Sequence, residues 1–207
     1  SIFFFCNEFF DALPVNQIVK RNNKIYEKKL NLIDDNFDFC EHIINNKKFE
    51  FLLNGEIYEY SPLTTLYARR IFQHIKKFGG YLLFFDYGPY KKERISTVQA
   101  IHKSEKCSIF DFPFKSDITY HVDFKSLEIL SKNFGLNFYG PVSQRKFLYY
   151  HGINERINSL INKTKSQQKK LELEQQFYRL TDPNGMGDLF KCVFISRDEW
   201  DLTVFRN

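Results

Sequence analysis

The chain has 207 residues, of which 43% are apolar and 18% aromatic, and its formal net charge is +5. This length and apolar content provide enough material for one domain with a packed core. The 30 basic residues are interleaved with 25 acidic ones, whereas a nucleic-acid surface usually shows as basic residues clustered on one element. We therefore expect no nucleic-acid partner.

The first element is a short apolar run, Ser1–Cys6, which predicts a buried strand. A loop over Asn7–Pro14 follows it. Residues 15–54 alternate between polar and apolar more than they follow a helical period, and the pair Asn22-Asn23 favours a hairpin turn. A second turn is predicted at DDNFDF. We expect residues 16–56 to form a β-rich insertion.

A helix and an apolar strand come next. Ser61 as N-cap and Pro62 at the first helical position predict the start of the helix, and Gly79-Gly80 predicts its end. Four apolar residues recur at a spacing of four and predict one helical face: Leu63, Tyr67, Ile71 and Ile75. The run YLLFFDYG then predicts a strand of a parallel sheet that is covered on both faces.

The rest of the chain continues the α/β pattern. Residues 89–122 are polar and rich in loops, and Asp123 can cap a helix that runs to about Phe134 and closes at Gly135. The stretch LNFYGPVS predicts another strand, with Ser143 opening further helix. Residues 153–180 are helical in pattern, DPNGMGD predicts a turn, and LFKCVFIS predicts a final strand. The sequence thus predicts one α/β domain.

Cysteines and histidines are scattered along the chain. Cys6, Cys40, Cys107 and Cys192 form no CxxC pair, and the five histidines lack metal-ligand spacing, so we expect no metal site. Free cysteines in apolar surroundings favour a reducing compartment. No apolar stretch approaches the roughly 20 residues that span a bilayer, and SIFFFC does not resemble a signal peptide. We expect a cytoplasmic protein in a bacterium, or a mitochondrial matrix protein in a eukaryote.

Polar side chains follow two of the predicted strands, and ligands of open parallel sheets bind beyond the carboxyl ends of the strands. Asn7, Glu8 and Asp11 follow the first apolar run, and Asp86 follows the run YLLFF. A single acid at a strand end is most often a helix cap or a solvated loop residue. A carboxylate among phenylalanines, however, needs a cation or a hydrogen-bond donor. A guanidinium fits this need, because it pairs with a carboxylate through two hydrogen bonds.

Six stretches carry a resemblance over almost all of the chain: NEFFDALPV, GGYLLFFDYG, TVQAIHK, SDITYHVDFKSL, GPVSQRKFLYYHGINER and RLTDPNGMGDLFKCV. In this order they resemble motifs of the MidA family of S-adenosylmethionine-dependent methyltransferases. The resemblance implies a Rossmann-like class I methyltransferase fold, with a mostly parallel sheet that ends in an antiparallel strand. It also implies methyl transfer from S-adenosyl-L-methionine to a protein. In the mitochondrial members, which assist assembly of respiratory complex I, the implied acceptor is an arginine on a core subunit of that complex.

The resemblance and the position of the polar residues suggest roles. We expect Glu8 to be the main clamp on the guanidinium and Asp11 to support it, because positioned carboxylates can hold its charge and steer one nitrogen. Asn7, nearest to the strand end, is expected to contact the methionine part of the cofactor. A second group is expected to line the substrate side: Asp86, Tyr87 and His121. The alternatives are that Asp86 caps a helix or turn and that His121 is a structural hydrogen-bond partner.

The glycine-rich cofactor loop of the family is expected before NEFFDALPV. The glycine pairs Gly79-Gly80 and Gly185-x-Gly187 do not form a strand–GxGxG–helix unit. We therefore interpret residues 1–207 as the C-terminal portion of a methyltransferase domain that is incomplete at its N-terminus and inactive without an N-terminal half. The strand SIFFF would then expose an apolar edge. The alternative is a non-catalytic binding or assembly module for a respiratory-chain subunit.

Overall fold

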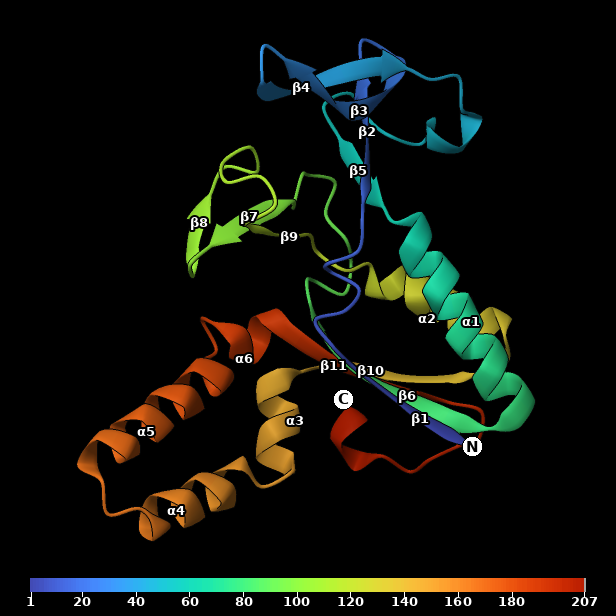
Figure 1. Ribbon diagram of the computed structural model, residues 1–207. Helices are drawn as coiled ribbons and strands as arrows, with labels where there is room; N and C mark the ends of the chain where they lie inside the picture. Colours follow the sequence, from blue (N-terminus) through green and yellow to red (C-terminus); the bar gives the residue numbers. More distant parts are fainter. Residues whose placement is uncertain (207) are drawn as a thin grey trace.

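The centre of the molecule is a four-stranded mixed sheet with the order β1-β6-β11-β10 (Figure 1). The computed structural model describes residues 1–206. The strands are β1 (Ile2–Asn7), β6 (Gly80–Tyr87), β11 (Phe190–Ser196) and β10 (Asn137–Ser143). β1 and β6 are parallel, whereas β11 is antiparallel to both of its neighbours. The four predicted apolar strands and the antiparallel direction of the last one are therefore confirmed.

Strand β1 lies at one edge of this sheet, where its neighbour within residues 1–206 is β6. Its side chains Ile2, Phe3 and Phe5 are exposed, Phe5 by 58%. The prediction of a buried strand is wrong, because the apolar run is covered on one side only. The expected apolar edge is present instead. At the start of β6, Gly80 allows the two strands to approach, since a Cβ there would lie 2.1 Å from the carbonyl oxygen of Ile2.

Helices α1 (Pro62–Phe78) and α2 (Phe124–Asn133) cover one face of the central sheet. Both begin where the sequence predicts. The Ser61 hydroxyl accepts a hydrogen bond from the amide of Thr64 at 3.1 Å, and the Asp123 carboxylate accepts one from the amide of Ser126 at 3.0 Å. Asp123 is thus a helix cap.

The core of this layer combines both helices with the sheet: Ala68, Phe72, Ile75, Leu82, Phe84, Phe124, Leu127, Val193 and Ile195. The predicted face of α1 is only partly right. Ile75 is buried, but Tyr67 is exposed, and the neighbouring positions Ala68 and Phe72 carry the contact with the sheet. The four-residue spacing drifts around a helix of 3.6 residues per turn, which explains the error.

The opposite face of the sheet is covered by α3 (Gln144–Tyr150) and the short helix η2 (Thr203–Phe205). They pack on Phe85 and Cys192, and burial raises the pKa of the Cys192 thiol. Helices α4 (Ile153–Lys163) and α5 (Gln167–Thr181) form a hairpin that extends away from the sheet (Figure 1). Helix α6 (Met186–Leu189) occupies part of the segment predicted to be a turn, DPNGMGD.

A second sheet, entirely antiparallel, has the order β4-β3-β2-β5. Its strands are β2 (Asn16–Arg21), β3 (Lys24–Ile33), β4 (Asn36–Ile43) and β5 (Ile57–Tyr60), and the short helix η1 (Lys47–Phe49) lies between β4 and β5. The predicted turns at Asn22-Asn23 and Asp34-Asp35 are confirmed, and all four residues have positive φ. Residues 16–56 are therefore β-rich as predicted, but β5 extends the sheet beyond the predicted end, and the status of this segment as an insertion stays a prediction.

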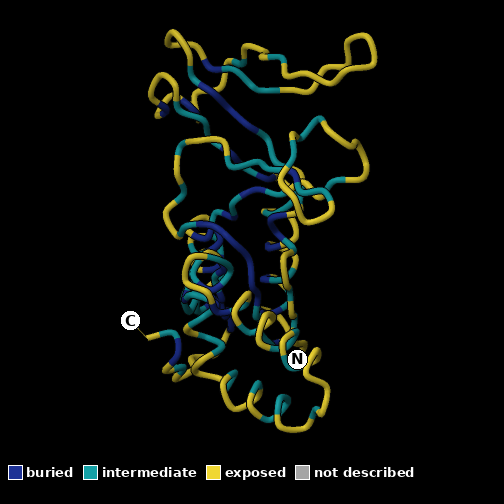
Figure 2. Tube along the Cα trace, turned by 90° about the vertical axis from the view of Figure 1, so that its left-hand side faces the viewer, coloured by how far each residue is buried: buried dark blue, intermediate teal, exposed yellow. Residues whose placement is uncertain are grey.

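A third, small sheet has the order β8-β7-β9 and is formed by β7 (Gln99–His102), β8 (Glu105–Cys107) and β9 (Asp117–Thr119). It lies within the segment expected to be mainly loop. Figure 2 shows buried residues in the central sheet, in the helices beside it and in part of the second sheet, whereas the hairpin tips are exposed. Within residues 1–206, no helix is long and apolar enough to cross a membrane, and no group of metal-binding side chains is found.

Candidate functional site

The parallel pairing of β1 and β6 brings their carboxyl ends side by side, since Asn7 is in register with Phe85. The chain then turns at Glu8, which has a φ of 50° and donates its amide proton to the carbonyl of Phe85 at 2.9 Å. The Asn7 amide group donates a hydrogen bond to the Glu8 carboxylate at 3.1 Å, and both side chains are exposed. The two polar residues that end β1 therefore form the solvent-facing rim of the site.

Asp86 is fully buried beneath this rim. One carboxylate oxygen accepts a hydrogen bond from the amide of Phe10 at 2.9 Å, and the other accepts one from the amide of Tyr87 at 3.0 Å. Asp86 thus ties the loop after β1 to the end of β6, and it caps this loop rather than a helix. Burial, followed by the nearby charge of Asp11, raises the pKa of Asp86 to about 8.

Asp11 is the second buried acid, only 2% exposed. One of its carboxylate oxygens, Oδ1, is buried and has no hydrogen-bond partner in the described structure. Burial and the charge of Glu8 raise the pKa of Asp11 to about 6. A buried carboxylate oxygen without a donor is costly, so Oδ1 of Asp11 is a candidate acceptor for a hydrogen-bond donor or a cation.

The segment Tyr120–Val122 closes the site from a third direction. The Tyr120 amide donates to the carbonyl of Asp11 at 3.2 Å, and the Val122 amide donates to the carbonyl of Tyr87 at 3.0 Å. The ring of His121 contacts the ring of Tyr87 edge-on, with 5.2 Å between centroids. Its Nδ1 is buried without a partner, and burial lowers the pKa of His121. The alternative role expected for His121, as a structural hydrogen-bond partner, therefore finds no support at Nδ1.

Tyr87 is buried, and its hydroxyl is already engaged. It lies 2.6 Å from the Thr119 hydroxyl and accepts a hydrogen bond from the Gln99 amide group at 2.8 Å. These partners lie on β9 and β7, so Tyr87 connects the central sheet to the small third sheet. The role predicted for Tyr87 in substrate binding stays a prediction. The hydrogen bonds of its hydroxyl show that it joins the two sheets.

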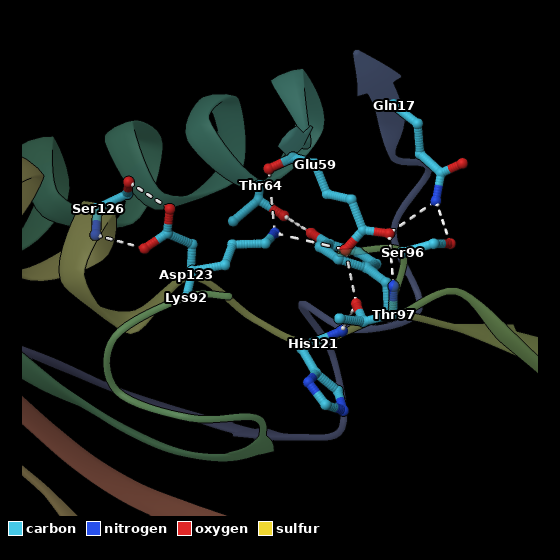
Figure 3. A network of polar contacts seen from close by, with 10 residues as sticks. Gln17, Glu59, Thr64, Lys92, Ser96, Thr97, His121, Asp123 and Ser126 are labelled. Atoms are coloured by element: carbon cyan, nitrogen blue, oxygen red, sulfur yellow. Dashed lines mark hydrogen bonds and ion pairs between the residues drawn. The ribbon is translucent and has the colours of Figure 1, made fainter. Parts of the chain in front are cut away.

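A buried polar network that the sequence does not predict lies beside His121 (Figure 3). Its centre is Glu59 on β5, only 1% exposed, which accepts hydrogen bonds from the Gln17 amide group (2.8 Å), the Thr97 amide (2.9 Å) and the Thr97 hydroxyl (2.6 Å). The Lys92 ammonium lies 3.8 Å from the same carboxylate. The Thr97 hydroxyl also accepts from the amide of His121 at 2.9 Å. The second sheet thereby fixes the backbone of His121.

One signal for this network exists in the sequence. Glu59 interrupts the apolar and aromatic strand segment IYEY, and a charge inside such a strand needs a buried partner. Its partners come from positions 17, 92 and 97, however, and nothing in the local pattern connects these positions. The partners therefore required the three-dimensional structure.

The cofactor implied by the MidA resemblance finds only a partial fit among residues 1–206. Asn7 offers one exposed amide group at the end of β1. Both glycine pairs serve packing instead: Gly80 approaches Ile2, and a Cβ at Gly187 would lie 2.6 Å from the carbonyl oxygen of Asp182. The described residues do not by themselves fit the whole of S-adenosylmethionine.

Comparison with known proteins gives the family of the chain. Residues 1–142 match a family described as "Putative S-adenosyl-L-methionine-dependent methyltransferase". The chain belongs to this family. The assignment to the MidA family of methyltransferases, made from the six motifs, is confirmed. Since the match covers residues 1–142, it includes Asn7, Glu8, Asp11, Asp86 and His121.

The chain is also similar to curated proteins that are named as protein arginine methyltransferases. The chain is 29% identical over 198 residues to the mitochondrial "Protein arginine methyltransferase NDUFAF7 homolog" of Caenorhabditis elegans, covering 90% of this chain and 44% of the relative. It is 27% identical over 197 residues to the mitochondrial "Protein arginine methyltransferase NDUFAF7" of Bos taurus, covering 92% of this chain and 44% of that protein. The chain thus spans about half the length of the relatives it matches.

Solved structures share the fold. A protein of Burkholderia thailandensis bound to S-adenosyl-homocysteine superposes with a TM-score of 0.83 at 22% identity, over 99% of this chain and 56% of that one. A second structure from the same organism gives a TM-score of 0.81 at 22% identity, over 99% and 58% of the two chains. The mixed α/β sheet is therefore the one found in these proteins.

Proposed function

We propose that this chain carries the methyl-acceptor side of a protein arginine methyltransferase. The observation that supports this proposal is the buried Asp11 carboxylate, whose Oδ1 has no partner in the described structure, between Glu8 and the end of β6. A guanidinium entering this site would supply a positive charge and a hydrogen-bond donor for Oδ1 of Asp11. The curated relatives named as protein arginine methyltransferases point to the same acceptor group.

The acids divide the work according to their surroundings. Glu8 is exposed and can meet the arginine as it enters, while Asp11 is buried and receives it. A guanidinium nitrogen that accepts a methyl group must lose a proton, and a carboxylate that is hydrogen-bonded to this group can accept the proton. We assign Asp11 both tasks, holding and deprotonation, and Glu8 the outer clamp, which exchanges the main and supporting roles expected from the sequence because Glu8 is exposed and Asp11 is buried.

Asp86 and His121 support this arrangement. Asp86 fixes the loop that carries Glu8 and Asp11 through the amide of Phe10. A pKa of about 8 leaves Asp86 mainly protonated at pH 7, so Asp11 is not forced to share its site with a second negative charge. His121 is held beside Tyr87 with its Nδ1 buried and without a protein partner in the described structure, and we assign this nitrogen to a contact with the entering side chain or with a bound water molecule.

The cofactor side belongs to the same proposal. The apolar edge of β1, with Phe3 and Phe5 exposed, would be covered in a larger assembly, and the relatives are about twice the length of this chain. We assign cofactor binding mainly to groups outside residues 1–206 and expect this chain alone to be inactive. The core subunit of respiratory complex I implied by the MidA resemblance remains the proposed protein substrate.

Calorimetry with S-adenosylmethionine tests the cofactor part. The chain alone should give no saturable heat and no rise in melting temperature at millimolar cofactor. Saturable binding at micromolar cofactor would show that residues 1–206 hold the cofactor themselves, and it would contradict this part of the proposal.

Methyl transfer to protein tests the acceptor part. The chain, completed by the N-terminal half of a relative, is assayed for transfer of a tritiated methyl group to arginine. Glu8→Gln and Asp11→Asn should each lower the rate at least about tenfold, because each removes a charged hydrogen-bond partner of the guanidinium. Glu174→Gln, an exposed change on α5 with the same loss of charge, is the matched control. Normal transfer by Glu8→Gln and Asp11→Asn would refute the assignment.

A further inference from the structure

An apolar groove begins directly beside the acids. It has a volume of about 800 Å³ and runs between the second and third sheets. The residues after Asp11 line it, among them Ala12, Leu13 and Pro14. Tyr120, whose amide binds the carbonyl of Asp11, also lines it. The lining of the groove therefore begins at the residue that follows Asp11, and Tyr120 contacts both the groove and the backbone of Asp11.

Aromatic side chains from separate segments form the walls. Phe39 on β4 meets Phe110, from the loop between β8 and β9, edge-on with 5.1 Å between ring centroids. Phe114 lies on the rim and is fully exposed, at 103%. Phe112 and Phe114 both have positive φ, which is uncommon for bulky residues and is often found at functional loops. The loop thus presents an apolar surface to solvent beside the acid site.

The charges select the kind of occupant. Only three of the residues that line the groove are charged, namely Glu27, Lys28 and Lys29, and Glu27 is paired with Lys29 at 3.2 Å. Lys28 lies over the ring of Phe39 at 3.8 Å from its centroid. The groove therefore suits apolar side chains, whereas the adjoining Glu8 and Asp11 suit a cation and would repel an anionic lipid headgroup.

We propose that this groove binds an extended segment of the methyl-acceptor protein, in which the target arginine is flanked by an aromatic or large aliphatic residue. This inference rests on the proposed function, because the arginine must enter the acid site while its neighbour enters the groove. A volume of about 800 Å³ lies within the range of specific ligand sites. The apolar contact supplies affinity and selects the protein segment, and the acids select the arginine.

Peptide binding measured by fluorescence anisotropy tests the proposal. The probes are fluorescein-labelled nine-residue peptides with a central arginine in a serine and glycine background, and each carries one phenylalanine or leucine at a single flanking position. At one or more positions the apolar residue should tighten binding to the full chain about tenfold over the all-polar peptide. Phe114→Ser should abolish this gain. Phe78→Ser, at the exposed end of α1, should retain it as the matched control.

The outcomes separate the groove from the acid site. Replacing the central arginine by citrulline tests the proposed function, since citrulline has the same shape without the charge. An apolar preference that persists while citrulline binds as well as arginine would refute the acceptor assignment and keep the groove. Equal binding of apolar and polar peptides, or no saturable binding of any peptide, would overturn the groove proposal. Self-association in sedimentation that Phe114→Ser abolishes would assign the groove to a second copy and would also overturn it.

Because Phe114 is fully exposed, Phe114→Ser should fold normally. A second variant, Phe39→Ser on β4, removes the facing wall of the groove and must reduce the same apolar preference. An apolar gain that survives both substitutions would overturn the proposal.

Discussion

The substitution Asp86→Asn should destabilise the folded protein at low pH and stabilise it at high pH. In the wild type, the buried Asp86 carboxylate accepts two backbone hydrogen bonds, from Phe10 and Tyr87. An asparagine can accept only one of them, and its amino group then faces the other amide. We expect this mismatch to cost about 1–3 kcal/mol at every pH.

Ionisation of Asp86 acts in the opposite direction. Its pKa rises from 3.8 to about 8 on folding, so the folded chain holds this proton more tightly than the unfolded chain. The stability that Asp86 contributes is therefore largest below pH 3.8 and declines as the pH rises toward about 8. At about 1.4 kcal/mol for each tenfold change in proton affinity, the full decline is about 6 kcal/mol. Asparagine has no carboxyl group to ionise, so the variant avoids this loss of stability and keeps only the mismatch cost. Asp86→Asn should therefore be more stable than the wild type by about 3 kcal/mol at pH 9.

Urea unfolding followed by circular dichroism at pH 4, 6.5 and 9 measures the difference in free energy of unfolding between Asp86→Asn and the wild type. The variant should be less stable at pH 4 and more stable at pH 9. Asp35→Asn, an exposed change in the β3–β4 turn, is the control and should give no reversal. An Asp86→Asn variant that is destabilised equally at all three pH values would show that Asp86 is ionised in the folded protein, and the reasoning would be refuted.

Three further predictions concern the frame around the site. Glu59→Gln should lower the free energy of unfolding by about 3–5 kcal/mol, because it leaves Lys92 buried without its ion-pair partner. Adding Lys92→Met should recover part of this loss in chemical denaturation, and no recovery would contradict the ion pair. Ser61→Ala should cost about 1 kcal/mol in the same assay through loss of the α1 cap, whereas Ser61→Asp should not. Gly80→Ala should separate β1 from β6, seen as faster amide hydrogen exchange in Phe3–Phe5, because a Cβ there would overlap the carbonyl of Ile2; unchanged exchange would contradict the close approach.

Local signals predicted most of the elements. Ser61, Asp123 and Ser143 each cap the helix that the sequence assigned to them, because capping depends on residues three positions apart. The turns at Asn22-Asn23 and Asp34-Asp35 follow from the tolerance of these residues for positive φ. Burial was less predictable. The apolar run of β1 was expected to be buried, yet burial depends on which strands lie on either side, and this is not a local property.

The candidate site shows the same contrast. Strand-end acids could be singled out from sequence because β1 and β6 are apolar runs followed at once by polar residues. The difference in burial between these acids could not be predicted from sequence. Glu8 is exposed while Asp11, three residues later, is buried, because the turn at Glu8 folds Phe10 and Asp11 back over the end of β6. The Glu59 network was missed because it joins four distant segments.

The central claim is that Asp11 is the carboxylate that receives the arginine of the acceptor protein. Carbon-13 NMR of the Asp11 carboxyl group, identified by its absence in Asp11→Asn, tests this claim most directly. In the free chain the carboxyl group should titrate with a pKa of about 6. A saturating arginine peptide should lower this pKa by at least about one pH unit, because a bound cation favours the ionised form, and the matching citrulline peptide should not. A titration that the arginine peptide leaves unchanged would contradict the account.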